Sequence, residues 1–404
     1  MILEQFRQRK LEVLVFVDYY LPGYKAGGPI KTISNLVDRL GDEFCFRIVT
    51  RDRDFDDGKP YYNDTGNWRS VGKAEVRYVP PEQCSYTFMR KILTETHYDI
   101  VYFNSLFSPC FTIFPLISHN LSSKRKIPVI LAPRGEVADS ALGLKSYKKT
   151  PFLKLAKMLK LFDNIKWHAS SPYEAENVHR LFDTHKNIAK VKFVPNVVIA
   201  PDLPESPSHE LQNVPDGARW KKHNNLKIVF LARIARMKNL DGALKLLQGV
   251  HGNIQFDIYG PLEDRAYWAE CEDLIRMLPP NIEVQYKGHI KREDVLTVLK
   301  KYHIFFLPTL GENFGHVILE ALSAGCPVLI SDRTPWRGLE DKGVGWDIPL
   351  EEPERFQTVL RQCVEMDCES LKVLSSQAID FAHVVAIDEN VVELSRSLFL
   401  EAMT

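Results

Sequence analysis

Two glutamates, Glu312 and Glu320, stand with seven residues between them in the segment 304–331. Apolar runs at both ends of this segment predict a strand, a loop, a helix and a second strand. A unit of this kind places the loop and the start of the helix at the carboxyl edge of a parallel sheet, where α/β proteins bind ligands. Gly311 and Gly315 let the loop backbone come close to a ligand, and the free N–H groups at the start of the helix favour an anion.

This segment resembles the E-x7-E signature of the retaining glycosyltransferases of family 4. The signature reads Glu312-Asn-Phe-Gly-His-Val-Ile-Leu-Glu320 and is followed by an Ala-x-Gly-x-Pro-Val run. The resemblance covers nearly the whole chain. It implies an α/β fold of two Rossmann-like domains (GT-B) that face each other across a cleft, with a nucleotide sugar bound at that cleft.

The resemblance also implies roles for the residues of the signature. Glu312 would hold the hydroxyl groups of the donor sugar, and Glu320 would accept hydrogen bonds from the ribose. The backbone amides of three residues would cap the phosphate or the sugar: Phe314, Gly315 and His316.

Two cations precede the signature in the same half of the chain. Arg233 ends the apolar run 226–233, and Lys238 follows five residues later. In the family, an Arg and a Lys at this spacing neutralise the donor diphosphate, and fixed positive charge stabilises a leaving group that gains negative charge. Gly260 and His289, at the turns after the next two strands, would lie near the nucleoside.

A second glycine-rich loop follows the first predicted strand, 13–17. It ends in Gly27 and Gly28, and Pro29 suits the first turn of the next helix because proline lacks the N–H that would be unpaired there. The resemblance places this loop near the donor diphosphate and the acceptor; the alternative is a tight strand-to-helix turn. The loop is not the G-x-G-x-x-G fingerprint, which argues against a dinucleotide oxidoreductase.

Two more strand ends in the first half carry polar residues. The run 128–133 leads into Arg134-Gly-Glu136, and another strand ends at Asn104. Many family members have a histidine where Arg134 stands, so the role of that histidine is not transferred. Arg134 could hold an acceptor phosphate or carboxylate, with Glu136 and Asn104 on the acceptor side. The alternative is a buried Arg–Glu pair that fixes the turn.

Length and composition predict two domains. The chain has 404 residues, of which 45% are hydrophobic and 26% charged, and it fits two domains of about 200 residues. The proline-rich polar segment 197–225 is the predicted linker. It separates an acceptor domain, 1–196, from a nucleotide-sugar domain, 226–385, and a final helix, 386–404, is expected to cross back to the first domain.

The net charge of zero conceals two unlike halves. Residues 1–200 carry 30 Lys and Arg against 21 Asp and Glu, whereas residues 201–404 carry 22 against 31. The stretch 145–162 holds six lysines and no acid, with four apolar residues at helical spacing: Phe152, Leu155, Leu159 and Phe162. It predicts either a basic amphipathic helix on an anionic membrane or a helix packed on its own domain with solvated lysines.

Other classes of protein and site are not indicated. No apolar run is as long as the roughly 18 residues that a membrane-spanning helix needs. The N-terminus lacks the cleavage site of a signal peptide. The seven scattered cysteines indicate neither a disulfide framework nor a zinc site and are expected to be buried free thiols in a reducing cytosol. We therefore expect a cytoplasmic protein, with peripheral attachment to the inner face of the plasma membrane as a further option.

The expected reaction is transfer of a sugar from a UDP- or GDP-sugar to a hydroxyl group of a glycan or lipid-linked acceptor. The resemblance implies retention at the anomeric carbon and a place in cell-surface polysaccharide or lipopolysaccharide biosynthesis. The nucleotide sugar is a co-substrate, and neither a cofactor, a metal nor a nucleic-acid partner is expected. The alternatives are an epimerase or phosphorylase of the same fold and a catalytically silent binding subunit.

Overall fold

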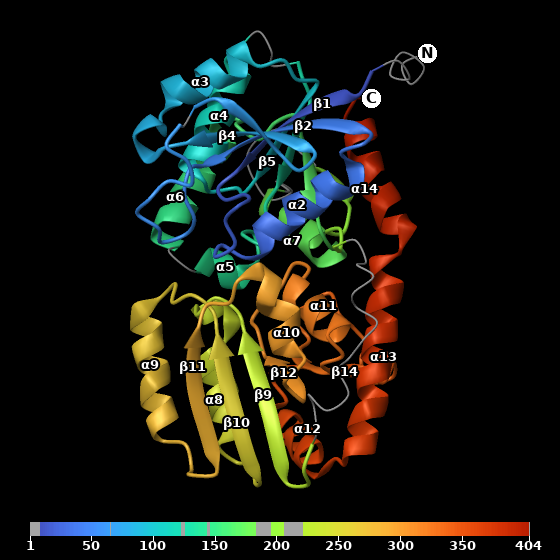
Figure 1. Ribbon diagram of the computed structural model, residues 1–404. Coiled ribbons are helices and arrows are strands. Elements are labelled where there is room, and N and C mark those ends of the chain that lie inside the picture. Colours follow the sequence, from blue (N-terminus) through green and yellow to red (C-terminus); the bar gives the residue numbers. More distant parts are fainter. Residues whose placement is uncertain are drawn as a thin grey trace. The chain divides into compact units, whose positions relative to one another are not determined.

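The computed structural model describes residues 9–64, 66–122, 126–143, 146–182, 195–205 and 221–403. The chain divides into two compact units, which Figure 1 shows with their elements labelled. Unit 1 comprises Met1–Leu203 and Glu389–Thr404, and unit 2 comprises Pro204–Asp388. The strand predicted over 191–194 and residues 206–220 of the predicted linker lie outside the described residues.

Unit 1 is built on an eight-stranded sheet with the order β3-β4-β2-β1-β5-β6-β7-β8. Only the pair β3 and β4 is antiparallel among the described strand pairs. Alternate residues of the central strands enter two separate hydrophobic clusters, one on each face of the sheet, as the two-residue period of a strand requires. The strands are β1 (Leu11–Val17), β2 (Phe44–Arg51), β3 (Trp68–Val71), β4 (Ala74–Val79), β5 (Ile100–Asn104), β6 (Val129–Ala132), β7 (Ile165–Ala169) and β8 (Asn196–Ile199).

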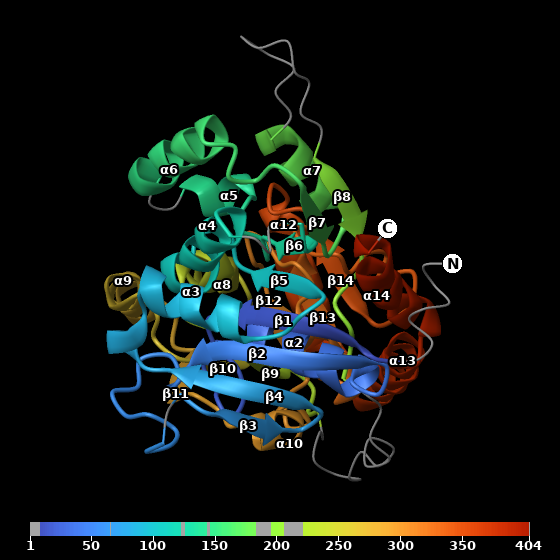
Figure 2. The same ribbon diagram turned by 90° about the horizontal axis from the view of Figure 1, so that it is seen from above.

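Helices cover both faces of this sheet. Phe399 of the last helix packs against Phe44 and Phe46 of β2, with ring centroids 5.3 and 6.0 Å apart, so the C-terminal helix belongs to unit 1. Figure 2 shows the strands of this sheet side by side. The helices are α2 (Gly28–Leu40), α3 (Tyr86–Glu95), α4 (Phe114–Asn120), α5 (Asp139–Gly143), α6 (Ser146–Met158), α7 (Pro172–Phe182) and α14 (Glu389–Ala402), with the short turns η2 (Pro81–Gln83) and η3 (Pro109–Ile113).

Unit 2 contains a six-stranded parallel sheet with the order β11-β10-β9-β12-β13-β14. The strands are β9 (Asn225–Leu231), β10 (Asn253–Tyr259), β11 (Ile282–Gly288), β12 (Ile304–Leu307), β13 (Val328–Ser331) and β14 (Gly345–Ile348). The helices are α8 (Leu240–Leu247), α9 (Arg265–Arg276), α10 (Val295–Leu299), α11 (His316–Ser323), α12 (Pro353–Glu365) and α13 (Cys368–Ala386), with the turns η5 (Arg236–Lys238) and η6 (Arg292–Asp294). One hydrophobic core unites this sheet with its helices.

The fold class of two Rossmann-like domains is confirmed, because each unit has a parallel sheet covered by helices. The segment 304–331 forms β12, α11 and β13 in the predicted order. Strands β3, β8 and β14 were not predicted. Strands β3 and β8 contain no buried residue, and Asp347 interrupts β14, so these strands lack the continuous buried apolar run of the equally short β12.

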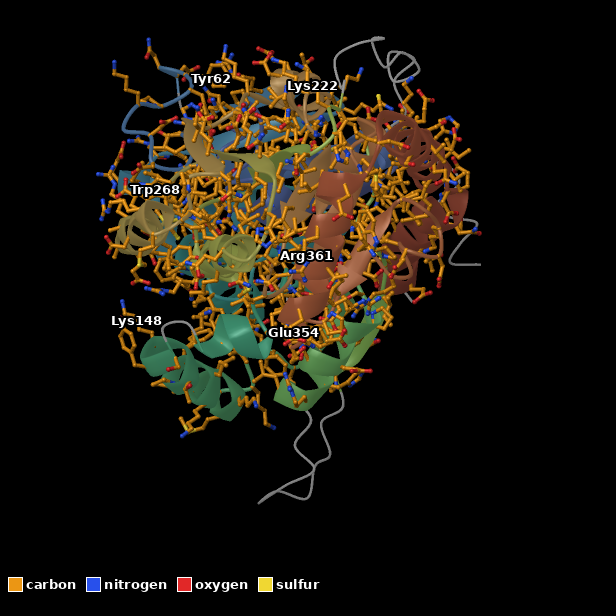
Figure 3. The ribbon with its side chains drawn as sticks, turned by 90° about the horizontal axis from the view of Figure 1, so that it is seen from below. Tyr62, Lys148, Lys222, Trp268, Glu354 and Arg361 are labelled. Carbon is orange, nitrogen blue, oxygen red and sulfur yellow. A yellow bond between two sulfur atoms is a disulfide. The ribbon has the colours of Figure 1, made fainter. Side chains whose placement is uncertain are left out.

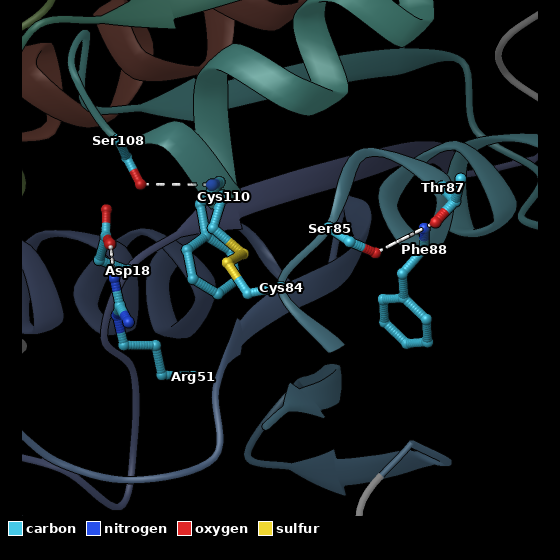
Figure 4. Close-up of a disulfide and its surroundings, with 9 residues drawn as sticks. Asp18, Arg51, Cys84, Ser85, Thr87, Phe88, Ser108 and Cys110 are labelled. Atoms are coloured by element: carbon cyan, nitrogen blue, oxygen red, sulfur yellow. Dashed lines mark hydrogen bonds and ion pairs between the residues drawn. A yellow bond between two sulfur atoms is a disulfide. The ribbon is translucent and has the colours of Figure 1, made fainter. Parts of the chain in front are cut away.

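The expectation that all cysteines are buried free thiols is wrong. Cys84 and Cys110 are joined by a disulfide, with Cα atoms 5.5 Å apart (Figure 4). Cys84 follows η2 and Cys110 lies in η3, so packing of the segments around α3 and α4 brings together residues that are 26 positions apart. Among the described residues the other five cysteines are free, and Cys45 is exposed rather than buried.

Candidate functional site

An ion pair between Lys238 and Glu312 joins the loops that follow β9 and β12. The Lys238 Nζ donates to the Glu312 Oε1, and the two side chains are only 16% and 13% exposed. The loops meet because the carbonyl of Met237 accepts hydrogen bonds from the Leu310 N–H at 2.8 Å and from the Thr309 hydroxyl at 3.0 Å. Since β9 and β12 are neighbours in the sheet, residues far apart in sequence share its carboxyl edge.

The residue before α8, which directly follows Lys238, also contacts the loop after β12. Asn239 has left-handed backbone angles, φ 56° and ψ 45°, immediately before α8. Its Nδ2 donates to the Pro308 carbonyl at 2.8 Å. This further hydrogen bond between the same two loops restricts the position of the Lys238 backbone.

Arg233 lies two residues beyond β9 and is about one-third exposed. Its Nη1 is 2.5 Å from the Glu263 Oε2. The neighbouring loop needs glycine at position 260, because a Cβ there would lie 1.8 Å from the Ala232 carbonyl oxygen and φ is +141°. The Gly260 N–H donates to the Gly288 carbonyl at 2.8 Å, so the ends of β9, β10 and β11 are tied together.

The turn into α11 is fixed by an aromatic residue from another loop. Gly315 has φ 78° and ψ 59° directly before the helix. The Trp336 indole N–H, from the loop after β13, donates to the Phe314 carbonyl at 2.5 Å. The ring of Phe314 also packs against the rings of Trp336 and His316, with centroids 5.5 and 4.8 Å apart. Trp336 was not predicted as a site residue.

The remaining predicted residues of unit 2 also lie at this edge. Glu320 is half-buried on α11, one turn beyond His316, so the two side chains share a face of the helix. His289 is exposed and follows Gly288 at the end of β11. Unit 2 therefore places the predicted donor-side cations, carboxylates and amides after the carboxyl ends of β9, β10, β11 and β12.

In unit 1, Arg134 is the centre of a buried hydrogen-bond network. Its Nη1 is 2.6 Å from the Asp202 Oδ1, and the two side chains are 8% and 5% exposed. The Asn104 Oδ1 accepts from the Arg134 Nε and Nη2 at 3.0 and 2.7 Å, and the Tyr102 hydroxyl accepts from Nη2 at 2.5 Å. Arg134 therefore forms its buried ion pair with Asp202 and not with a glutamate, as the alternative interpretation had it.

His168 extends the network. Its Nδ1 lies 2.7 Å from the Tyr102 hydroxyl oxygen, and its Nε2 lies 2.7 Å from the Ala200 carbonyl oxygen. Burial lowers the pKa of His168 to about 4, and the charge of Arg134 acts in the same direction. A neutral His168 donates from Nε2 to the carbonyl and accepts from the hydroxyl at Nδ1.

Glu136 fixes the loop that follows β5. Its carboxylate accepts hydrogen bonds from the N–H groups of Leu106 at 2.5 Å and Phe107 at 3.2 Å, and from the Ser105 hydroxyl at 3.0 Å. Burial raises the pKa of Glu136, and the nearby negative charge of Asp18 raises it further. The structure thus shows Glu136 organising its own domain.

The loop before α2 is also held by a carboxylate. The Asp54 Oδ2 accepts from the N–H groups of Tyr24 at 2.7 Å and Lys25 at 3.0 Å. Gly27, with φ 75°, precedes the helix. A Cβ built on Gly28 would meet no described atom within 4 Å, so the backbone at the start of α2 has open space beside it.

Among the described residues, no group of three or more His, Cys, Asp and Glu side chains could hold a metal ion. The expectation of a metal-independent reaction remains a prediction.

The part of the chain that carries the site of unit 2 is similar to a known protein family. Residues 217–381 match the family of group 1 glycosyl transferases. The matched range includes Arg233, Lys238, Glu312 and Glu320.

Proteins with similar sequences transfer N-acetylglucosamine according to their names. The GtfA component of the UDP-N-acetylglucosamine–peptide N-acetylglucosaminyltransferase of Streptococcus agalactiae is 24% identical over 146 residues, which cover 35% of this chain and 28% of that protein. The gpi3 component of the phosphatidylinositol N-acetylglucosaminyltransferase of Schizosaccharomyces pombe is 25% identical over 146 residues, which cover 35% of this chain and 29% of that protein. The chain thus spans less than a third of the length of these curated relatives.

Solved structures are similar over nearly the whole chain. HepE of Anabaena in complex with UDP and glucose has a TM-score of 0.64 at 14% identity and covers 97% of this chain and 99% of its own. The glycosyltransferase WaaG has a TM-score of 0.64 at 14% identity, covering 96% and 99%. These findings support a GT-B glycosyltransferase. Because the sequence identity is only 14%, the likeness to these two structures shows a shared GT-B fold.

Proposed function

We propose that the protein is a retaining glycosyltransferase of family 4, which transfers a sugar from a UDP- or GDP-sugar to a hydroxyl group of a glycan or lipid-linked acceptor. The observation that carries this proposal is the Lys238–Glu312 ion pair at the carboxyl edge of the unit 2 sheet. The pair combines a cation with a carboxylate whose two oxygens can also accept a sugar hydroxyl. Both residues lie within the group 1 match.

The donor diphosphate is proposed to bind at the cations and at the start of α11. Lys238 is held by Glu312, and Arg233 by Glu263, so both positive charges are positioned by carboxylates. The backbone N–H groups of Phe314, Gly315 and His316 precede or open α11, where the helix dipole favours an anion. Catalysis then rests on charge that is in place before the reaction begins.

The nucleoside is proposed to bind beside α11 and the carboxyl ends of β10 and β11. Glu320 accepts hydrogen bonds from the ribose, and Gly260 and His289 lie beside the base. Two relatives are named for N-acetylglucosamine transfer, and HepE is described with UDP and glucose. UDP-N-acetylglucosamine and UDP-glucose are therefore the first donors to test.

The proposed reaction needs no covalent bond to the protein. The bond between the anomeric carbon and the donor phosphate oxygen breaks, and the acceptor oxygen bonds to the same face of that carbon. The acceptor proton passes to the leaving phosphate oxygen, so atoms and charge balance. Arg233 and Lys238 stabilise the negative charge that develops on the diphosphate.

The residues predicted on the acceptor side are proposed mainly to hold neighbouring parts of unit 1 in position. Arg134 and Asn104 bond to each other and to buried partners, and Glu136 bonds to the loop after β5. We propose that these residues shape the strand ends of unit 1. Gly27 and Gly28 remain proposed donor contacts, because the backbone at Gly28 has space for a ligand.

The proposed pathway is assembly of a cell-surface polysaccharide or lipopolysaccharide in the cytoplasm. It fits the basic first half of the chain and the description of WaaG as a glycosyltransferase of lipopolysaccharide biosynthesis.

A panel of UDP-, GDP- and ADP-sugars tests the proposal, with calorimetric binding and slow donor hydrolysis as readouts. We expect one nucleotide class to bind and to be hydrolysed, and Glu320→Ala to weaken its binding. Epimerised or phosphorolysed product without transfer to any acceptor would favour an epimerase or phosphorylase. Tight binding without turnover, in the presence of a range of acceptors, would favour a silent binding protein.

A further inference from the structure

Helix α6 presents an apolar stripe to the outside of unit 1. Tyr147, Leu155, Met158 and Leu159 are 71%, 50%, 72% and 65% exposed. Residues 147, 151, 155 and 158 follow the i, i+4, i+8, i+11 spacing of one helix face, and Pro151 between them is exposed as well. Figure 2 shows α6 at the margin of the unit.

The opposite side of α6 anchors the helix to unit 1. Leu153 and Ala156 are buried there, and Phe152 packs against Phe107 and Phe162 with ring centroids 5.9 and 6.4 Å away. The expectation that Phe152, Leu155, Leu159 and Phe162 form one apolar face is therefore wrong. The helix ends at Met158, and the four residues divide between the core and the surface.

The lysines of this stretch differ in their contacts. Lys149 donates to the Ala141 carbonyl at 2.7 Å and lies over the Phe107 ring, whereas Lys157 bonds to the Leu181 carbonyl and lies over the Phe182 ring. Burial lowers the pKa of Lys157. Lys157 is nevertheless exposed, as are Lys148, Lys154 and Lys160, and Lys148 extends away from the ribbon in Figure 3.

We propose that this surface, formed by the exposed side chains of 147–160, docks unit 1 on an anionic membrane. Three outward cations flank the apolar stripe, and the stretch 145–162 contains no acidic residue, so its charge is complementary to acidic lipid headgroups. The exposed apolar side chains suit the boundary between headgroups and acyl chains, where amphipathic helices lie. None of the described helices has the length and apolarity to cross a bilayer, so the contact is peripheral.

Vesicle co-sedimentation of the full chain tests this surface independently of any transfer activity. The probes are phosphatidylcholine vesicles with and without phosphatidylglycerol. We expect binding only to the anionic vesicles, and we expect added salt to weaken it because exposed charges are screened. Lys148→Glu, Lys154→Glu and Lys160→Glu in one variant should lower the partition coefficient about 100-fold, since each basic residue near such a surface contributes about fivefold.

The matched control reverses three exposed lysines elsewhere, Lys91, Lys291 and Lys372, and thus changes the net charge equally. It should bind anionic vesicles much more tightly than the α6 variant does. For the apolar stripe, Leu155→Ser with Met158→Ser should weaken binding more than Leu121→Ser with Met277→Ser, two residues that are similarly exposed.

Circular dichroism and thermal unfolding show whether each variant folds. The proposal is overturned if wild-type protein binds neutral and anionic vesicles equally, or if the two triple variants lose binding to the same degree. It is also overturned if no vesicle binds and the α6 variants instead abolish self-association in size-exclusion chromatography, because the surface would then pair two copies of the chain.

Discussion

The indole N–H of Trp336 donates to the backbone carbonyl of Phe314, and the two atoms are 2.5 Å apart. Trp336 is 7% exposed, and its ring also packs against Phe381 of α13 with centroids 6.3 Å apart. The loop that carries Glu312 is thus tied to the loop after β13 and, through the same ring, to a helix far along the chain. A surface loop with such an anchor can present its amides in a fixed direction.

Replacing Trp336 with Phe should therefore weaken donor binding as well as stability. The variant keeps an aromatic ring but leaves the Phe314 carbonyl without this donor, which should cost about 1–2 kcal/mol of unfolding free energy. Urea unfolding and calorimetry with UDP measure the two effects. Trp167→Phe is the control, because Trp167 is equally buried but its Nε1 bonds to none of the described residues. It should leave UDP affinity unchanged; an equal loss of affinity in both variants would contradict the anchoring role.

Lys238→Ala should reduce kcat/KM for the donor by about 100-fold or more, because it removes charge that stabilises the leaving diphosphate. Glu312→Gln should reduce it less, since the amide keeps an oxygen acceptor but no longer holds the lysine. The double variant should be less impaired than the product of the two single effects predicts, because the residues act as a pair. Steady-state kinetics of the four proteins measures this coupling, and strictly multiplicative effects would show that the ion pair plays no joint role.

Arg134→Met distinguishes a structural arginine from one that holds an acceptor. The substitution leaves Asp202 buried without its cation, and we expect a loss of about 3–5 kcal/mol in unfolding free energy. Asp202→Asn in the same chain should recover part of that loss. Arg276→Met, at an exposed position, should change stability by less than about 0.5 kcal/mol. Wild-type stability combined with lost transfer in Arg134→Met would instead favour direct contact with an acceptor.

The pH dependence of stability should report on His168. Its pKa in the folded chain is about 4, below the usual value of about 6.5, so the unfolded chain binds the extra proton first as the pH falls. The stabilisation from neutral His168 is complete above pH 6.5 and is lost progressively as the pH falls towards 4. The difference corresponds to about 3 kcal/mol.

Chemical denaturation of wild type and His168→Gln across this range measures the effect. The glutamine variant should have a flatter profile between pH 6.5 and 4. Parallel profiles for the two proteins would mean that other groups dominate the acid sensitivity.

The sequence predicted the site best where the site residues lie within a short segment that has a clear apolar pattern. The apolar run at the start of the segment 304–331 predicted a strand, which is β12 at Ile304–Leu307, and the loop and helix that carry the two glutamates follow in the predicted order. Lys238, at its position after β9, was implied by the family resemblance, and the parallel sheet explains why it meets Glu312. The first prediction depends on a local pattern and the second on the resemblance, and both depend on the general rule that strand ends share an edge.

Contacts between distant segments could not be predicted in the same way. The partner of Arg134 is Asp202, 68 positions away in a proline-rich segment, and the disulfide joins the residue after η2 to η3 through helix packing. Which residues form the exposed face of α6 could not be predicted either, because helical spacing alone gives the sides of a helix but not which side the rest of the domain covers.

The most direct test of the central claim is the anomeric configuration of the transferred sugar. Once the donor panel has identified the nucleotide sugar, NMR of the initial product measures the coupling at the anomeric carbon before the product can equilibrate. We predict the same configuration as in the donor and a strongly reduced rate of product formation with Lys238→Ala. An inverted product, or transfer that persists unchanged in Lys238→Ala, would contradict a retaining reaction at the Lys238–Glu312 site.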